Sequence, residues 1–431
     1  MNNLPSEVVH NIVSYHRIAY PVFTSDHPHA CNYHSTPFLL RWLGSICSLN
    51  RVWYTATMPI LYSTIILNTD PHRRQRNQDK LASIKTNGRF VRHLIVNLTE
   101  KAGQAGSDED VFDELGAHLP RCTYLHISMQ THTTKQDFRR LHGLLQSFDH
   151  SQAHIRSLRL RSASFRSHMI VKEILLTIPA IVISQLEALE ISGWEINADY
   201  PPELSSRFWS IKRLSLVRLY SPSGLTWNPT LAGILNSLSS LAPLSASLEW
   251  LYIADSHIPS SSVITFLQTP SRTSSPLAPN IRTIGFQLTY LHIDITMHAI
   301  TIGKWNISDT PFVLISICPN LRTFLYFVPC PLTFILPGDD DMLPMSPLGT
   351  QTLPDLAELG LRVMKDTWPS SIHSGNVGLI LEWASSRERQ GNLRRFVLRC
   401  DSTDNYNEVK KRVEENTRSI DIEVQMSQRG T

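Results

Sequence analysis

The sequence lacks most of the features that mark secreted, membrane-embedded or nucleic-acid-binding proteins. Its six cysteines are scattered without a CxxC pair, which argues against a disulfide framework and favours a reducing compartment, cytoplasmic or nuclear. Lys and Arg total 40 against 37 Asp and Glu, and this near balance argues against a nucleic-acid binder. The N-terminus shows no basic segment leading into an apolar stretch, so no secretory signal is expected.

Long uninterrupted apolar runs are missing as well. The most apolar stretch, 174–191, contains Pro179, Gln185, Glu187 and Glu190, which a membrane span does not easily tolerate. This stretch is better interpreted as the end of a core helix followed by a strand, and no membrane partner is expected.

The sequence contains none of the common local motifs of catalysis. No GxSxG, HExxH or GxGxxG is present, and Gly303-Lys304 lacks the upstream glycine of a P-loop. We therefore expect neither an enzyme nor a cofactor. Because catalytic triads are assembled in space, a divergent hydrolase or transferase with an α/β core stays an open alternative.

Four potential metal ligands, His27, His29, Cys31 and His34, lie within eight residues. Four such side chains can complete a tetrahedral zinc site, but their spacing matches no familiar finger and no second ligand pair is evident. The segment is interpreted as a polar surface loop, without a metal.

A short phrase recurs along the chain: apolar, two residues, apolar, one residue, apolar. The second and third apolar residues are two apart, so in an extended chain they point to one face, and the first closes the preceding turn onto the same core. Ten copies are spaced by 25 to 40 residues, which indicates a repeat architecture. They are Val91-Leu94-Val96, Cys122-Leu125-Ile127, Ile155-Leu158-Leu160, Leu186-Leu189-Ile191, Ile211-Leu214-Leu216, Leu248-Leu251-Ile253, Ile281-Ile284-Phe286, Leu321-Phe324-Tyr326, Leu356-Leu359-Leu361 and Leu393-Phe396-Leu398.

The segments between several copies show helical spacing of apolar residues. Strands alternating with helices predict a solenoid, although an ordinary α/β domain with parallel strands shows the same alternation. The expected helices span 108–119, 136–148, 169–178, 230–241, 377–384 and 408–416, and Ile420, Ile422 and Val424 alternate as a closing strand.

The phrase resembles the strand portion of a leucine-rich repeat, LxxLxL followed by Asn or Cys. The Asn or Cys position is occupied by Ala163, Trp194, Leu219 and Ser256 in four copies, so the side-chain ladder that usually satisfies the backbone at the bend is expected to be missing. The resemblance implies a degenerate leucine-rich-repeat-like solenoid over 70–431.

The first part of the chain, 1–69, differs from the rest. Pro5, Ser6 and Glu7 suit the start of a helix, on which Leu4, Val8 and Ile12 share a face. A second helix is expected from about 38 to 57, ending before Pro59, and 65–67 is expected to form the first strand.

This part resembles the F-box in its fungal form, with a Leu-Pro start, then Leu-x-x-Val-Asn-Arg-x-Trp and Pro-x-Leu-Tyr phrases. The matching residues are Leu4, Pro5, Val8, Ile12, Ile46, Leu49, Asn50, Arg51, Trp53, Pro59, Leu61 and Tyr62. An insertion at about 16–37 is longer than the family's usual connection. The fold expected overall is α/β: a leucine-rich-repeat-like solenoid preceded by a small all-α F-box-like module.

The resemblance implies a substrate-recognition adaptor of a cullin–RING ubiquitin ligase of the SCF type. The Skp adaptor, which links to the cullin scaffold, would dock on Leu4, Pro5, Val8, Ile12, Ile46, Leu49, Trp53 and Pro59. In leucine-rich repeats the residues between apolar strand positions usually form the ligand face, so Arg159, Arg161, Glu190, Arg218 and Tyr252 are the candidates for binding an unknown protein substrate. The alternative is a leucine-rich-repeat scaffold for protein–protein interaction, with no ubiquitin ligase role, in which the helices only cap the first repeat.

Overall fold

The computed structural model describes part of the chain, in two compact units. The units comprise 1–159 with 177–182, and 160–176 with 183–431. Residues 16–35 of the expected insertion, the four potential metal ligands among them, and the helices expected at 230–241 and 377–384 lie outside the described residues, as does nearly all of the helix expected at 169–178. The described residues are 4–15, 36–68, 74–99, 114–130, 135–149, 151, 153–162, 178–193, 211–219, 248–256, 258–268, 283–295, 305, 310–328, 355–363, 393–400, 403–415 and 421–426.

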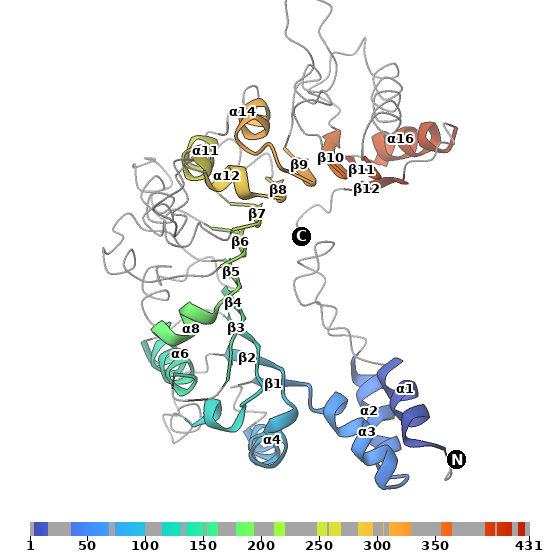
Figure 1. The fold of residues 1–431 in the computed structure, drawn as a ribbon, viewed down its shortest axis with the longest axis vertical. Coiled ribbons are helices and arrows are strands. Elements are labelled where there is room, and N and C mark those ends of the chain that lie inside the picture. Colours follow the sequence, from blue (N-terminus) through green and yellow to red (C-terminus); the bar gives the residue numbers. More distant parts are fainter. Residues whose placement is uncertain are drawn as a thin grey trace, which may run out of the picture. The chain divides into compact units, whose positions relative to one another are not determined.

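Three helices, α1 (Ser6–Tyr15), α2 (Thr36–Cys47) and α3 (Arg51–Leu61), precede the first strand (Figure 1). Helix α3 packs against both of the others. Their shared core consists of buried Val9, Leu43, Trp53 and Ala56, with partly buried apolar residues around it. These helices therefore have a hydrophobic core of their own, and we refer to them as the helical module.

The prediction of a single helix over 38–57 is wrong, because the structure has two helices there, α2 and α3. The Asn50 side chain accepts hydrogen bonds from the backbone N–H groups of Val52 (2.9 Å) and Trp53 (3.1 Å), which satisfies the first orphan donors of a new helix. Helix α3 also continues through Pro59 to Leu61 instead of ending before it.

The sheet contains twelve parallel strands, paired in sequence order from β1 to β12 and not closed. Each strand therefore pairs with the strands that precede and follow it in the chain. The strands are β1 (Thr64–Asn68), β2 (His93–Thr99), β3 (Tyr124–Gln130), β4 (Ser157–Ser162), β5 (Ala188–Ser192), β6 (Arg213–Val217), β7 (Trp250–Ala254), β8 (Tyr290–Asp294), β9 (Thr323–Phe327), β10 (Glu358–Val363), β11 (Arg395–Cys400) and β12 (Asp421–Met426).

Nine of the ten copies of the apolar phrase coincide with a strand, and all of their apolar residues are buried. Parallel pairing brings the phrases into register, for example Leu94 opposite Leu125 and Val96 opposite Ile127. The expected first strand and closing strand are also present, as β1 and β12. The phrase therefore identifies the face of the sheet that carries the core.

The strand predicted from the copy Ile281-Ile284-Phe286 is wrong. Ile284 begins the short helix α12 (Ile284–Gln287), which also contains the exposed Phe286. The strand comes later, as β8, and it carries an overlapping copy of the same phrase, Leu288-Leu291-Ile293, whose members are all buried.

A ladder of shared carbonyls precedes the strands. The carbonyl oxygen of Arg92 accepts hydrogen bonds from the N–H groups of Thr123 (2.9 Å) and Tyr124 (3.0 Å), and that of Thr123 accepts from Arg156 (2.9 Å) and Ser157 (3.0 Å). The ladder satisfies both N–H groups where the backbone turns into each strand. The carbonyls of Ser63, Glu187, Lys212, Glu249, Thr289, Arg322 and Ala357 are shared in the same way.

Helical segments connect the strands and pack on the core. Within the second unit, α11, α12 and α14 contact one another beside β7 to β9 (Figure 1). The helix expected at 136–148 is present as α6, whereas the described part of 108–119 holds only the 3₁₀ turn η4. The segments are α4 (Arg74–Asn87), η3 (Gly88–Phe90), η4 (Leu115–His118), α6 (Lys135–Ser147), α8 (Ala180–Gln185), α11 (Ser260–Gln268), α12, α14 (Thr310–Ile317) and α16 (Thr403–Glu415).

Three glycines allow successive helical segments to approach closely. A β-carbon at Gly88 would lie 1.9 Å from the carbonyl oxygen of His118, at the end of η4. A β-carbon at Gly116 would lie 2.2 Å from that of Ser147, at the end of α6, and one at Gly285 would lie 2.6 Å from that of Ile317, at the end of α14. Real β-carbons do not approach backbone atoms this closely, so these contacts require glycine.

The expectation that no side chain satisfies the backbone at the bends is wrong at Ser256. Its buried hydroxyl accepts a hydrogen bond from the N–H of Leu219 (3.3 Å), and it lies 2.8 Å from the carbonyl of Ala254 and 3.3 Å from that of Leu216. Leu219 occupies the same repeat position one copy earlier. A serine hydroxyl thus satisfies the backbone at the position where the leucine-rich-repeat resemblance predicts asparagine or cysteine.

Replacing Ser256 by alanine should lower the free energy of unfolding by about 1–3 kcal/mol, because the buried N–H of Leu219 loses its partner. Chemical unfolding followed by circular dichroism measures the change. Ser261→Ala, at an exposed position on α11, is the matched control and should change stability by less than about 0.5 kcal/mol. Equal midpoints for the two variants would contradict the role of Ser256.

Cys122 should resist alkylation in the folded protein. Burial raises the pKa of its thiol to about 12, so almost no reactive thiolate forms near pH 8. Iodoacetamide followed by peptide mass spectrometry should find Cys122 unmodified until urea unfolds the chain, while the half-buried Cys47 reacts earlier. Similar labelling rates for the two thiols in the native protein would show that the core opens at β3.

Candidate functional site

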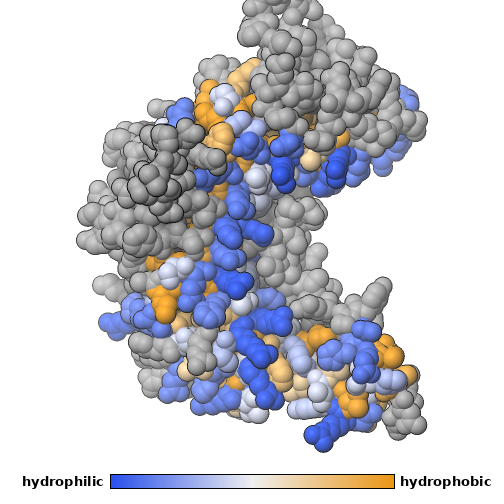
Figure 2. Space-filling model, viewed as in Figure 1, coloured by the Kyte–Doolittle hydropathy of each residue, from blue (hydrophilic) through white to orange (hydrophobic). Residues whose placement is uncertain are grey.

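Exposed apolar side chains concentrate on the helical module. Of the eight large hydrophobic residues exposed in the described part of the chain, five belong to it or directly flank its helices, and Figure 2 shows apolar surface over this region. Such a concentration on a small unit is typical of a protein-binding surface. The five are Leu4, Val8, Leu49, Val52 and Tyr54; the other three are Ile181, Phe286 and Met426.

Two helix starts hold these exposed residues in place. At α1, the carbonyl of Pro5 accepts the N–H groups of Val8 and Val9 (both 3.1 Å), so that Val9 enters the core and Val8 stays exposed. At α3, the Asn50 cap fixes the first turn, with Val52 exposed and Trp53 buried. The exposed set is therefore carried by two helices with a packed core beneath them.

The structure divides the residues predicted to dock the Skp adaptor. Leu4, Pro5, Val8 and Leu49 are exposed. Ile12 and Ile46 are partly buried against the module's core, and Pro59 is half-buried within α3. Trp53 is 5% exposed, so its side chain packs inside the module rather than at its surface.

Val52 and Tyr54 were missed by the sequence pattern, although both are exposed apolar side chains of α3. The signal that would have found them is Asn50, whose side chain is among the best N-caps. A cap at this position sets the phase of α3, and that phase places Val52 and Tyr54 away from the core.

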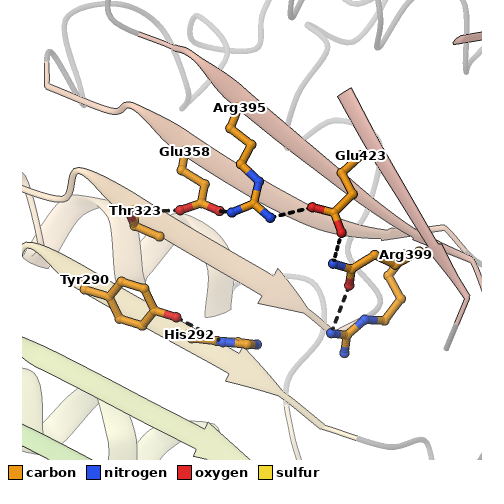
Figure 3. A network of polar contacts seen from close by, with 8 residues as sticks. Tyr290, His292, Thr323, Glu358, Arg395, Arg399 and Glu423 are labelled. Atoms are coloured by element: carbon orange, nitrogen blue, oxygen red, sulfur yellow. Dashed lines mark hydrogen bonds and ion pairs between the residues drawn. The ribbon is translucent and has the colours of Figure 1, made fainter. Parts of the chain in front are cut away.

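The second face of the sheet, opposite the apolar phrase, carries a lateral row of charged side chains in the second unit. Register places Thr323, Glu358 and Arg395 next to one another on β9, β10 and β11. Arg395 donates to Glu358 (2.8 Å) and to Glu423 of β12, and Thr323 donates to Glu358 (3.3 Å), as Figure 3 shows. Adjacent strands are therefore joined by a chain of charge-assisted hydrogen bonds.

Arg399 forms the second part of this network, four residues further along β11 on the same face. Its guanidinium pairs with Asp294 of β8 and lies 3.7 Å from the centroid of the Phe327 ring. It also approaches Gln425 (3.5 Å), whose amide donates to Glu423 (2.7 Å). The charges of Arg395 and Arg399 are thereby matched by carboxylates of neighbouring strands.

Aromatic rings occupy the same face between β7 and β9. Trp250 and Tyr290 are stacked with ring centroids 4.8 Å apart, and the rings of Tyr252 and His292 meet edge to face at 4.5 Å. The Tyr290 hydroxyl and His292 Nδ1 are hydrogen-bonded at 3.3 Å. Trp, Tyr and Arg together are the residues enriched in protein–protein hot spots.

The sequence matches no protein-family model and no curated protein. The interpretation of these surfaces therefore depends on the residues and geometry described above.

The residues predicted to bind a target protein do not share one environment. Arg159, Glu190 and Tyr252 are buried, whereas Arg161 and Arg218 are exposed. Arg218 has a positive φ of 51° at the end of β6, and it lies 4.0 Å from the carboxylate of Asp255. Of the five, only Arg161 and Arg218 are exposed to solvent.

Two ionisable groups near the second face have altered acidities. Burial raises the pKa of Tyr252 well above its usual range, and the charge of Asp294 adds to this effect. Burial and the nearby Asp294 also raise the pKa of Asp255, against the opposing influence of Arg218 and two further arginines.

Within the part of the chain that the structure describes, no group of three His, Cys, Asp or Glu side chains is arranged to hold a metal ion. Among the same residues, no helix is both long enough and apolar enough to cross a membrane.

Proposed function

We propose that this chain is a substrate-recognition adaptor of an SCF-type cullin–RING ubiquitin ligase. The helical module is an F-box-like unit that docks the Skp adaptor, which connects to the cullin scaffold. The twelve-stranded part is a leucine-rich-repeat-like solenoid that holds a target protein. The observation that carries the proposal is the helical module itself, three helices with a core cluster of their own and five exposed large apolar side chains, directly before sequential parallel strands.

The physical argument for docking is that the module is small but exposes several large apolar side chains. A unit of three short helices buries little apolar area and gains stability by covering its remaining apolar side chains with a partner. Leu4, Val8 and Leu49 are exposed and also belong to the residues that match the F-box pattern. These three are the centre of the proposed docking surface.

The physical argument for target binding is the composition of the second face. Half-buried Trp250 stacks on the buried Tyr290, which lies opposite Thr323, a member of the Glu358–Arg395–Glu423 network. The exposed part of the Trp250 ring and the partly exposed charged groups offer aromatic contact and directional hydrogen bonds. The chemistry of ubiquitin transfer belongs to other subunits in this proposal, so the chain itself needs no catalytic group and no cofactor.

One observation favours the alternative, a repeat scaffold whose helices only cap the sheet. Helix α3 contacts η3, which leads into β2, and the Ser83 hydroxyl of α4 donates to the Tyr62 hydroxyl at the end of α3 (3.0 Å). The module thus packs on the start of the repeats, as a terminal cap would. Binding of the Skp adaptor separates the two functions.

The test is a pull-down of the full chain with purified Skp adaptor, with affinity measured by biolayer interferometry. The wild type should bind, and Leu4→Asp/Val8→Asp should raise Kd at least about ten-fold, because two desolvated apolar contacts are lost. Trp53 is unsuitable for this test because its replacement disturbs the module's core.

Met426→Asp is the matched control, an equally exposed apolar residue on β12, outside the module. It should leave the affinity unchanged. A well-folded wild type that does not retain the adaptor would overturn the ligase proposal and favour the scaffold, and so would equal weakening by the two variants.

A further inference from the structure

Four exposed arginines gather where the chain turns into the strands of the first unit. Arg89 lies in η3, Arg92 directly before β2, Arg121 before β3 and Arg156 before β4. We refer to these four side chains as the basic ridge. All of them belong to the same compact unit and none contributes to the hydrophobic core.

The shared-carbonyl ladder fixes the spacing of the ridge. The N–H of Thr123 donates to the carbonyl of Arg92 (2.9 Å), and the N–H of Arg156 donates to the carbonyl of Thr123 (2.9 Å). Because neighbouring strands are about 4.8 Å apart, the backbones of Arg92 and Arg156 lie about 10 Å apart. Arg121 lies two residues before Thr123, in the turn that leads into β3. Flexible arginine side chains at this spacing can reach a single bound segment.

The charges of the ridge are not neutralised within the described part of the chain. Arg92, Arg121 and Arg156 form no ion pair there, and Arg89 instead lies over the Phe90 ring, with its guanidinium carbon 4.8 Å from the centroid. The arginines of the second face differ, since Arg395 and Arg399 are both paired with carboxylates.

This local excess of positive charge does not follow from the overall composition, which gives a net charge of only +3 for the whole chain. At the corresponding strand starts of the second unit, basic residues are interspersed with acidic and uncharged ones, in the order Glu187, Lys212, Glu249, Thr289, Arg322, Ala357 and Arg394. The concentration is therefore specific to the entries of β2 to β4.

We propose that the basic ridge binds an acidic polypeptide segment in an extended conformation. Each guanidinium offers a planar pair of donors that fits a carboxylate bidentately, and carboxylates on alternate residues of an extended peptide recur about every 6.8 Å. Three or four such contacts match the number and spread of the arginines. The inference is independent of adaptor docking and holds for a scaffold as well.

Nucleic acid fits the ridge less well. Binding of single strands relies on aromatic side chains that stack on bases, but Tyr124 is buried and the Phe90 ring is half-buried next to Arg89. The ridge also spans only three strands, whereas a nucleic-acid footprint is a longer basic stripe.

The experiment is fluorescence anisotropy of a labelled peptide of about ten alternating Glu and Asp residues, titrated with the full chain in about 50 mM salt. The wild type should bind, and binding should weaken steeply at about 300 mM salt because the contacts are exposed. Arg92→Glu/Arg121→Glu/Arg156→Glu should raise Kd at least about ten-fold, and the same triple change to Gln should raise it less.

Lys212→Glu/Arg322→Glu/Arg394→Glu is the matched control, with the same change in charge at exposed strand starts of the second unit. It should leave the affinity within about two-fold of the wild type. Equal weakening by the two triple variants would overturn the assignment to the ridge. Failure of the folded wild type to bind, or tighter binding of a single-stranded DNA of equal charge, would overturn the proposal itself.

Discussion

Replacing Trp53 by alanine should unfold the helical module while the sheet stays folded. The indole is 5% exposed and packs with Val9, Leu43 and Ala56 in the buried cluster that the three helices share. Removing a buried Trp side chain costs about 3–5 kcal/mol, which equals or exceeds the stability that a unit of this size usually has.

Hydrogen–deuterium exchange followed by mass spectrometry measures this effect. Peptides from α1 and α3 should lose protection in Trp53→Ala, and peptides from β7 to β9 should keep it. Tyr54→Ala is the matched control, because Tyr54 is the next residue and is 50% exposed. Its effect should stay within about 0.5 kcal/mol. Unchanged protection of α1 and α3 in the Trp53 variant would contradict the core described here.

Gly116→Ala should destabilise the first unit by about 3 kcal/mol or more. The added β-carbon would lie 2.2 Å from the carbonyl oxygen of Ser147 and 2.8 Å from the backbone nitrogen of Phe148. Both are backbone atoms, so no side-chain rotation relieves the clash, and the end of α6 must move. The same shift would disturb the hydrogen bond from the N–H of Gly116 to the Ser147 hydroxyl (3.0 Å).

The thermal midpoint of the first unit, followed by circular dichroism, should therefore fall by several degrees. Gly44→Ala is a matched control with the opposite expected sign. A β-carbon at Gly44 would meet nothing within 4 Å, and alanine is the better helix former, so this change in α2 should stabilise by about 0.5–1 kcal/mol. A neutral effect of Gly116→Ala would show that η4 and α6 do not pack this closely.

Much of the fold could be predicted because the apolar phrase has a two-residue spacing within each copy and also recurs at similar intervals along the chain. Residues two apart identify a strand and its core face, and recurrence at similar intervals identifies a repeated unit. The copy at Ile281 failed because two overlapping phrases compete there. The Thr283 hydroxyl accepts the N–H of Phe286 (3.3 Å) and caps α12, which leaves the later phrase to form β8.

The helical module could be predicted less well because one residue changes the helical phase. Leu49 and Trp53 are four apart and would share a face of a continuous helix. The break at Asn50 separates them, so Leu49 is 49% exposed while Trp53 is buried. The spacing alone does not reveal such a break.

The second face of the sheet could be assigned from the sequence, but the burial of its residues could not. Alternation along a strand places Arg159, Glu190 and Tyr252 on that face. Their exposure depends on side chains of other strands, as with His292 against Tyr252. A single sequence does not contain that information, and neither does it show that Arg395 and Arg399 neutralise carboxylates from neighbouring strands.

The sequential strand order has a consequence for how such a chain changes over evolutionary time. Because every strand pairs with its immediate predecessor and successor, duplicating or deleting one strand with its connection leaves the remaining pairings intact. Connections of unequal length are tolerated for the same reason, since loop closure costs rise only slowly with length. Such a protein can therefore gain or lose strands and diverge in its loops while each strand of the core still pairs with its neighbours in the sequence.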